Sequence, residues 1–200
     1  VTRVADDVTV RRISTLLEPE GRVTGQPVRL AENAGLAFIG CYVLGMGFVL
    51  DPAEARNWIA RDPRNAEVLF PYLNGDDLNS RPDLSASRWV IDFNNRSETD
   101  AATLPLPFAR VRNHVRPERL TNNRAVYRKN WWRYAERRPA MRKAIAGLDD
   151  YLVMAQTSNT LQPVVQRGWV VPSHKIVVFA STDRSLLALL ASSFHYSWAR

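Results

Sequence analysis

The alternation of hydrophobic and polar positions predicts short strands along the first half of the chain. Residues 36–50, LAFIGCYVLGMGFVL, combine aromatic and β-branched residues with three glycines, which predicts a strand, a tight bend with close backbone approach, and a second strand. Residues 88–93 alternate as a strand does, and residues 9–17 fit either a strand or a short helix. The apolar residues 66–73 lead into Asn-Gly-Asp-Asp at 74–77, which predicts a turn.

Capping and proline signals predict helices in the middle of the chain. Asp51 followed by Pro52 is typical of a helix start, and that helix is expected to run to about Arg61. The prolines at 103–107 predict a broken loop, and the residues after it have helical character. The predicted helical pieces begin at Pro117, continue over 130–134 until Arg138-Pro139 interrupts, and end with one turn at 140–145.

The last third of the chain predicts antiparallel strands followed by a helix. Three short apolar runs, at 151–155, 164–171 and 176–180, are separated by polar connections. Asp183 then caps a helix in SLLALLASSFHYSWAR, whose apolar residues recur at helical spacing. The predicted class is α+β, with mixed, mainly antiparallel sheets and flanking helices. We expect one domain over 1–200, with an α/β part at 1–100, a basic helical segment at 101–147 and a strand–loop–helix part at 148–200.

The distribution of charge along the chain says more about function than its composition does. The chain carries a net charge of +7, and its 46% of hydrophobic residues is ordinary for a globular protein. Residues 110–143 hold twelve Lys and Arg against two Glu, a net charge of +10, and ten of the twelve are Arg, which suits phosphate and guanine contacts. Tyr127, Trp131, Trp132 and Tyr134 lie among them. The segment predicts a nucleic-acid surface; the alternative is a solvated basic helix paired with carboxylates elsewhere.

Several other classes of protein are disfavoured. Cys41 is the single cysteine, which excludes an internal disulfide and a Cys-based zinc site and is typical of a small core residue. No run reaches the roughly 18 apolar residues that cross a bilayer, and the charged start VTRVADDVTVRR has no signal-peptide core. We therefore expect a cytoplasmic protein without a membrane partner. Because the chain begins without Met and ends on Arg200 inside a predicted helix, we also expect a piece of a longer protein.

Candidate cofactor and metal residues are few. Residues 45–47, Gly-Met-Gly, lack the spacing of a nucleotide-binding loop and the Lys-Ser/Thr that follows one, so they predict a structural bend. His114, His174 and His195 have no partner at i, i+4 and no neighbouring Cys, as a zinc site usually requires. We predict no catalytic, cofactor or metal site in this chain.

Polar side chains fill two connections between the C-terminal strands. Such side chains can contact base edges or sugar and phosphate oxygens, although any hairpin loop is rich in them. These residues are Gln156, Thr157, Ser158 and Asn159 in one connection and Ser173, His174 and Lys175 in the other.

Residues 65–93, NAEVLFPYLNGDDLNSRPDLSASRWVIDF, are similar to the segment [IL]FPYLNGxDLNxRPxxSxSRWVIxF of the large bacterial DNA methyltransferases and methyltransferase–nuclease fusions of the MmeI type. Further similar segments are DDVTVRR, LAENAGLAFIG with GMGF, WWRYAERRPAMRKAIAGL and SFHYSWAR, so the resemblance covers nearly the whole chain. It implies the target recognition domain, which in that family follows an optional nuclease and a class I methyltransferase.

The resemblance also implies what the longer protein does. Its methyltransferase domain would carry a methyl group from S-adenosylmethionine to the exocyclic amine (N6) of an adenine rotated out of the duplex, in restriction-modification or phage defence. This chain would be the partner of that domain and of double-stranded DNA. It contains no Asn-Pro-Pro-Tyr tetrapeptide and no glycine-rich cofactor motif, so it is expected to hold no cofactor and to perform no methyl transfer.

The resemblance assigns base selection to residues 156–159 and 173–175, and the basic segment is expected to supply affinity for phosphates. The predicted phosphate contacts are Arg124, Arg128, Lys129, Arg133, Arg137, Arg138 and Arg142.

Two alternatives stay open from the sequence. Asp76, Asp77 and Asp83 imitate the carboxylate cluster of a metal-dependent nuclease, although no acidic-x-Lys pair accompanies them and a turn with N-caps explains them equally well. The other alternative is a non-specific nucleic-acid-binding or protein-docking module that uses only its basic face.

Overall fold

The computed structural model describes residues 2–11, 13, 28 and 30–199, which fall into two compact units, 1–34 and 35–200. In the first unit, Arg3–Ala5 (β1) and Val8–Val10 (β2) form an antiparallel hairpin. The element expected at 9–17 therefore begins as a strand, and its remainder lies largely outside the described residues. Ala31–Asn33 (η1) form a 3-10 turn.

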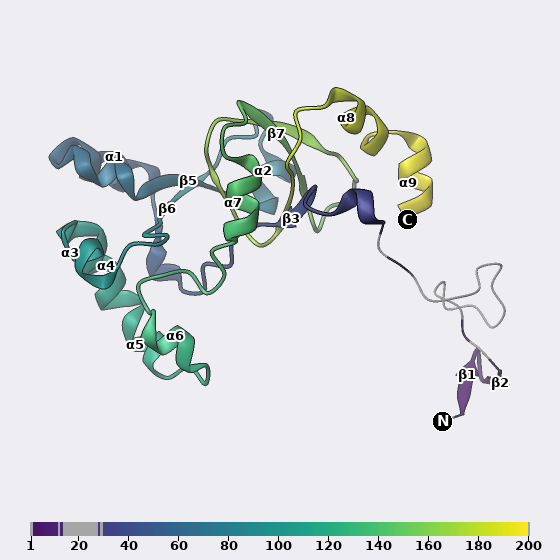
Figure 1. Ribbon diagram of the computed structural model, residues 1–200, viewed down its shortest axis with the longest axis horizontal. Helices are drawn as coiled ribbons and strands as arrows, with labels where there is room; N and C mark the ends of the chain where they lie inside the picture. The colour runs from purple at the N-terminus through teal and green to yellow at the C-terminus, as the bar shows by residue number, and fades with distance from the viewer. Residues whose placement is uncertain (1, 12, 14–27, 29, 200) are drawn as a thin grey trace. The chain divides into compact units, whose positions relative to one another are not determined.

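Two four-stranded sheets organise the second unit (Figure 1). The first has the strand order β3-β10-β7-β8, with all neighbours antiparallel. The second has the order β4-β6-β5-β9, antiparallel except for the parallel pair β5 and β9. This confirms the predicted α+β class with mainly antiparallel sheets. The strands are Ala37–Ile39 (β3), Val49–Leu50 (β4), Leu69–Leu73 (β5), Arg88–Ile91 (β6), Asp150–Ala155 (β7), Val164–Arg167 (β8), Val171–Pro172 (β9) and Ile176–Phe179 (β10).

Helices flank these sheets, with α3 to α6 gathered at one end of the second unit and α8 and α9 at the other (Figure 1). None of the helices in the described part of the chain is long and apolar enough to cross a membrane. The α-helices are Pro52–Arg61 (α1), Gly75–Ser80 (α2), Glu98–Ala102 (α3), Pro105–His114 (α4), Arg116–Leu120 (α5), Ala125–Lys129 (α6), Pro139–Ile145 (α7), Arg184–Leu190 (α8) and Ser193–Ala199 (α9), and the 3-10 turns are Met46–Phe48 (η2) and Pro63–Glu67 (η3).

Local signals at several element starts are confirmed. The Asp51 carboxylate accepts a hydrogen bond from the Ala53 N–H at 2.7 Å, which starts α1 as predicted. Asp183 caps α8 in the same way through the Ser185 N–H at 2.7 Å. Residues 36–50 do form two strands around a bend, but β3 and β4 belong to different sheets. This segment therefore connects the two sheets.

Close backbone approach explains two glycines of that segment. A Cβ atom on Gly40 would lie 2.1 Å from the Ser173 carbonyl oxygen, and one on Gly47 would lie 2.6 Å from the His114 Cβ atom. Neither position has room for any side chain, so the predicted role of these glycines is confirmed.

Two predicted loops are helices instead. The predicted turn at 74–77 is the start of α2, where Asn74 and Asp77 form a reciprocal capping box. The prediction of a broken loop at 103–107 is wrong because α4 begins at Pro105, in the first turn, where the missing N–H of proline costs no hydrogen bond.

Three predicted elements are interrupted. Residues 130–134 are a turn rather than a helix, because Trp131, Trp132 and Tyr134 all enter the core. The predicted strand at 164–171 divides at Gly168, whose φ of 68° ends β8. The C-terminal helix divides at Ser192, whose hydroxyl accepts the His195 N–H at 3.1 Å and so starts α9.

Candidate functional site

The two polar connections lie together at one end of the first sheet. Because β7 and β10 are antiparallel neighbours, the loop that leaves β7 (156–163) meets the loop that enters β10 (173–175). The pairing of Ala155 with Ile176 fixes this register, and the Gln156 N–H extends it by donating to the Lys175 carbonyl at 2.8 Å. The structure thus brings both predicted base-reading loops together.

The segment that carries the family resemblance reaches the same end through the second sheet. Strand β5 runs parallel to β9, pairing Leu73 with Pro172, and the Ser173 N–H donates to the Leu73 carbonyl at 2.8 Å. Asn74 and α2 follow β5 directly, so they lie beside the loop 173–175. A segment from the first half of the chain therefore meets two loops from the last quarter here.

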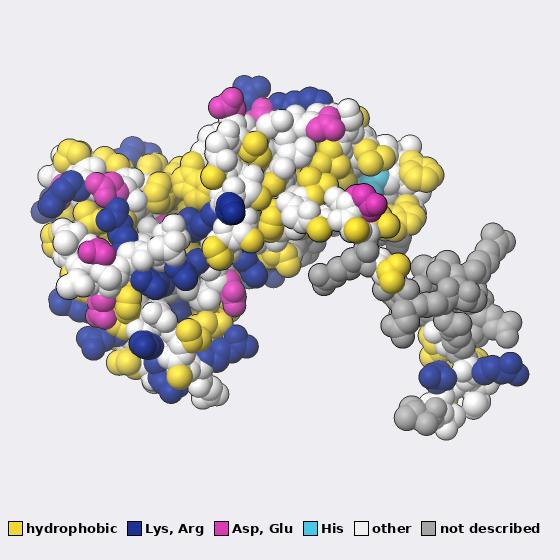
Figure 2. All heavy atoms as spheres, in the orientation of Figure 1, with side chains coloured by type: hydrophobic (Ala, Val, Ile, Leu, Met, Phe, Trp, Pro, Cys, Tyr) yellow, Lys and Arg dark blue, Asp and Glu magenta, His cyan; other side chains and the backbone are white. Residues whose placement is uncertain are grey.

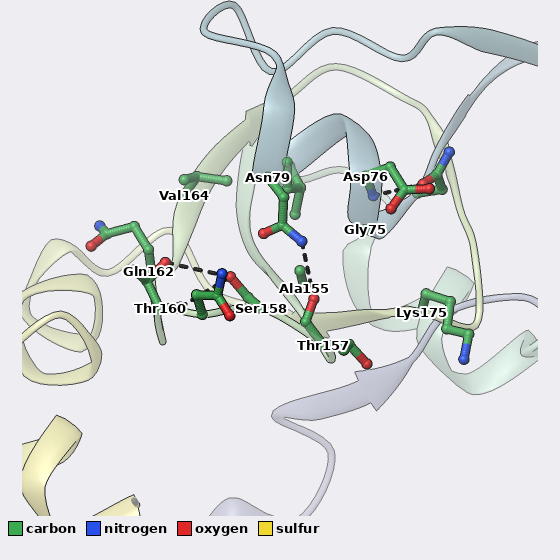
Figure 3. Close-up of a pocket in the computed structure, with 13 residues that line it drawn as sticks. Gly75, Asp76, Asn79, Ala155, Thr157, Ser158, Thr160, Gln162, Val164 and Lys175 are labelled. Atoms are coloured by element: carbon green, nitrogen blue, oxygen red, sulfur yellow. Dashed lines mark hydrogen bonds between the residues drawn. The ribbon is translucent and has the colours of Figure 1, made fainter.

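These three segments line a pocket of about 730 Å³, which we call the loop pocket (Figure 3). The Asn79 side-chain amide donates to the Thr157 carbonyl at 3.0 Å and ties α2 to the first loop. Figure 3 shows Lys175 on one side of the loop pocket and Thr160 and Gln162 on the other. The polar side chains that the loops contribute are Thr157, Ser158, Asn159, Thr160, Gln162 and Lys175.

The predicted base-reading residues do not all share this position. Thr157, Ser158, Asn159 and Lys175 line the loop pocket, and Gln156 is exposed beside it. The prediction that Ser173 contacts bases is corrected by its burial. Its side chain is only 2% exposed, and its hydroxyl accepts the Lys175 N–H at 3.2 Å. Ser173 therefore holds the second loop from within the core and presents no side chain to solvent.

His174 lines a second, smaller pocket of about 330 Å³. Its ring packs edge-on against Tyr42, with 4.8 Å between the ring centroids, and Arg88 lines the same pocket. Burial, together with the positive charges of Lys175 and Arg138, lowers the pKa of His174 below its usual value. The lowered pKa favours the neutral ring, in which one nitrogen atom can accept a hydrogen bond.

The sequence did not single out Asn79, Thr160 or Gln162 as pocket residues. Asn79 belongs to the segment resembling the MmeI-type family, and this was a usable signal. No sequence signal identified Thr160 and Gln162, because their positions depend on where the first loop turns back toward β8.

The acidic residues near α2 hold the backbone in place. Asp77 is 2% exposed, and its carboxylate accepts the N–H groups of Asn74 at 3.0 Å and Ser87 at 3.1 Å. Asp83 accepts the Ser85 N–H at 3.2 Å and lies 3.6 Å from Arg81. The described residues contain no group of three His, Cys, Asp or Glu placed to hold a metal ion. The geometry of Asp77 is that of a structural clamp.

The basic segment, residues 110–143, is built differently from the predicted surface. Its four aromatic residues, Tyr127, Trp131, Trp132 and Tyr134, are all buried, so they form core rather than stacking positions for bases. This corrects the interpretation of the aromatic residues as part of a nucleic-acid surface.

Most of the predicted phosphate contacts donate hydrogen bonds within the protein. The Arg133 guanidinium donates to the Asn95 and Arg96 carbonyls, and Arg137 donates to the Asn94 carbonyl. Arg142 forms an ion pair with Asp92 at 2.6 Å. The others are Arg124 with the Tyr127 hydroxyl, Arg128 with the Asn122 carbonyl and Arg138 with the Gly40 carbonyl.

Exposed cations without such partners remain in the segment. Arg112, Lys129 and Lys143 are exposed and have no hydrogen-bond or ion-pair partner in the described part of the chain. Figure 2 shows Lys and Arg side chains over the end of the second unit that carries α3 to α6. Of the seven predicted phosphate contacts, Lys129 is the one that fits this description.

Arg119 is the most deeply buried cation of the segment. It is 1% exposed, and its guanidinium donates to the carbonyls of Val43 at 2.9 Å, Leu44 at 3.0 Å and Arg133 at 3.3 Å. Burial lowers the pKa of Arg119, which nevertheless stays charged at neutral pH. Arg119 therefore holds the segment after β3 against the basic segment.

We expect Arg119→Met to lower the free energy of unfolding by about 2 kcal/mol, because it leaves buried carbonyls without a donor. Arg112→Met removes an exposed Arg from the neighbouring helix and should change it by less than about 0.5 kcal/mol. Urea titrations followed by tryptophan fluorescence measure both. Equal midpoints for the two variants would contradict the structural role of Arg119.

Comparison with known proteins finds a similar fold by structure but no match by sequence. The amino-acid sequence matches no protein-family model and no curated protein. The structure has the same fold as part of a restriction-modification enzyme. This neighbour is the Type IIL restriction-modification enzyme MmeI, solved in complex with DNA, with a TM-score of 0.68 at 18% sequence identity. The match covers 96% of this chain and 25% of the MmeI chain, so this chain spans about a quarter of its neighbour's length.

Proposed function

We propose that the chain binds double-stranded DNA in a sequence-specific manner, as the target recognition domain of a restriction-modification enzyme. The observation that carries this proposal is the convergence of three segments on the loop pocket. Two of them are the polar loops 156–163 and 173–175, and the third is α2, from the segment that resembles the MmeI-type family. Polar side chains grouped on adjacent loops suit contacts with base edges in the major groove.

Two further observations support a DNA partner. The structural neighbour MmeI was solved in complex with DNA, and the likeness extends over 96% of this chain. The net charge of +10 on residues 110–143 suits a polyanion. In this proposal, exposed cations such as Arg112 and Lys129 contact phosphates while the loop pocket selects the sequence.

The longer protein in this proposal is a bacterial, cytoplasmic adenine-N6 methyltransferase that uses S-adenosylmethionine. Methyl transfer requires the target adenine to leave the base stack. The present chain would hold the duplex so that the methyltransferase domain of the same protein meets an adenine in one sequence context only.

Selection from a pool of randomised duplexes tests the proposal directly. The chain should enrich one short consensus, and a duplex carrying it should bind at least about 1,000-fold more tightly than an unrelated duplex. Structured RNA of equal charge serves as the competitor. Equal binding to every duplex, or preference for the RNA, would reject the target recognition function in favour of a non-specific basic module.

Salt dependence tests the phosphate contacts separately. The double variant Arg112→Met/Lys129→Met should weaken binding to all duplexes alike and reduce the slope of log K against log[salt] by about 1.8, because each lost phosphate contact removes about 0.9. Fluorescence anisotropy at several salt concentrations measures the slope. Arg64→Met is the control, since Arg64 is exposed but already paired with Asp62 at 2.7 Å. A slope as steep as that of the original chain would exclude these two cations from the interface.

A further inference from the structure

Two unpaired charges of opposite sign lie where the loop pocket joins the smaller pocket around His174. Asp76 in the first turn of α2 and Lys175 just before β10 line both pockets. Both residues are exposed. In the part of the chain that the structure describes, neither the Asp76 carboxylate nor the Lys175 ammonium group has a hydrogen-bond or ion-pair partner, and the two are not paired with each other.

The backbones that carry these two side chains are fixed close together. A Cβ atom on Gly75, the residue before Asp76, would lie 3.8 Å from the Lys175 Cβ atom and 3.7 Å from its carbonyl oxygen. The Asp76 N–H donates to the Asn74 side chain at 2.7 Å, and the Lys175 carbonyl accepts the Gln156 N–H at 2.8 Å. The backbones that carry one acceptor and one donor are therefore held next to each other, and both side chains extend from them with polar ends unsatisfied by the described residues.

This arrangement disfavours a phosphate as the ligand of Lys175. The Asp76 carboxylate would repel a phosphate placed between the two side chains. A ligand that presents a hydrogen-bond donor next to hydrogen-bond acceptors satisfies both groups. Both kinds of base pair present an amino group beside acceptors in the major groove. Lys pairs with guanine O6 and N7 and Asp pairs with the cytosine N4 amino group, so these two side chains favour a G·C pair.

We infer that Asp76 and Lys175 together recognise one G·C base pair of the target sequence. The Lys175 ammonium donates to guanine O6 and N7, and the Asp76 carboxylate accepts from the cytosine N4 amino group. This inference rests on the proposed function, because it assigns a base pair to the loop pocket of a DNA-binding domain. It adds a residue of α2 to a recognition surface otherwise made of loops.

The test is duplex selection with Asp76→Asn and Lys175→Met beside the original chain. The original chain should require G·C at one position of its consensus, and each variant should lose about 10-fold of the preference for G·C at that same position. Replacing this guanine by 7-deazaguanine, which lacks N7, should weaken the original chain and leave Lys175→Met unaffected.

Matched controls separate recognition from loss of charge or fold. Asp149→Asn and Arg64→Met each remove one charge of the same sign at exposed positions outside both pockets and should keep the G·C preference. Circular dichroism verifies the fold of each variant. If the chain selects a consensus but the two pocket variants leave its G·C positions unchanged, or alter different positions, this inference fails alone. If the chain selects no duplex at all, the proposed function fails with it.

Discussion

Gly40→Ala should lower the free energy of unfolding by about 3–5 kcal/mol, one of the two largest effects we expect from a single substitution in this chain. The added methyl group would lie 2.1 Å from the Ser173 carbonyl oxygen and 2.6 Å from that of Pro172. Both neighbours are backbone atoms, so no side-chain rotation can relieve the overlap. Overpacking costs about 1–3 kcal/mol, and each broken backbone hydrogen bond adds about 1 kcal/mol.

Two backbone hydrogen bonds depend on this close approach. The Gly40 N–H donates to the Ile176 carbonyl at 3.0 Å, and the Cys41 N–H donates to the Pro172 carbonyl at 2.7 Å. Gly75→Ala is the matched control, because its new Cβ atom would make only ordinary contacts beyond 3.6 Å. Thermal and urea unfolding compare the two variants. A Gly40→Ala variant as stable as Gly75→Ala would mean that residue 40 does not approach Ser173 this closely.

Gly40 also illustrates how far the sequence can predict this fold. The glycines of residues 36–50 indicated close approach, but not the partner, which lies more than 130 residues further along the chain. Signals that act within a few residues were sufficient for α1, where Asp51 and Pro52 specify the helix start. Pairing between distant segments, such as the parallel pair β5 and β9, leaves no comparable local signal.

The same difference between local signals and distant pairing applies to the candidate site. The sequence shows that the two loops are polar, but not that they lie together. Consecutive antiparallel hairpins would place these two connections at opposite ends of a sheet, whereas in the structure β7 pairs directly with β10. That α2 closes the loop pocket does not follow from the sequence either, because Asn-Gly-Asp-Asp is equally typical of a turn and of a helix cap. Asp76 and Asn79 line the pocket because they belong to this helix, so the sequence did not identify them as pocket residues.

Within the basic segment, the burial of the aromatic residues and the internal partners of most Arg side chains could not be predicted, for a physical reason. A run of Arg with interleaved Trp and Tyr has the same composition whether it faces a nucleic acid or packs into a core. Arg can be buried when several of its donors meet carbonyl groups, as the Nε and Nη2 groups of Arg119 do with Leu44 and Val43. Sequence alone gives the charge of such a segment but not the direction of each guanidinium, and the carbonyls that receive them come from other parts of the chain.

The interior also contains a buried ion pair between Asp92, which directly follows β6, and Arg142 of α7. The Arg142 guanidinium lies 2.6 Å from the Asp92 carboxylate, and the two side chains are 13% and 1% exposed. Burial opposes the charge on Arg142, but Asp92, Cys41 and Tyr134 together outweigh burial and raise the pKa of Arg142. The guanidinium also lies over the Trp169 ring, 5.4 Å from its centroid. Burial raises the pKa of the adjacent Cys41 thiol to about 11, as expected for a core cysteine.

Asp92→Ala should therefore lower the free energy of unfolding by about 3–5 kcal/mol, because it leaves the Arg142 charge buried without its partner. Urea denaturation at pH 7 measures the loss. Glu67→Ala is the matched control: it breaks the pair between Glu67 and Arg96, which is equally short at 2.6 Å but largely exposed, and such pairs contribute only about 0–1 kcal/mol.

A second substitution distinguishes the unpaired charge from lost packing. The double variant Asp92→Ala/Arg142→Met removes both charges, so it should recover much of the stability lost in Asp92→Ala, since replacing a buried pair by apolar groups is often neutral. If the double variant is no more stable than Asp92→Ala, the loss comes from packing around Asp92 and from its hydrogen bond with the Asn94 N–H at 3.0 Å. If Asp92→Ala is as mild as Glu67→Ala, the pair is not held in a dry interior.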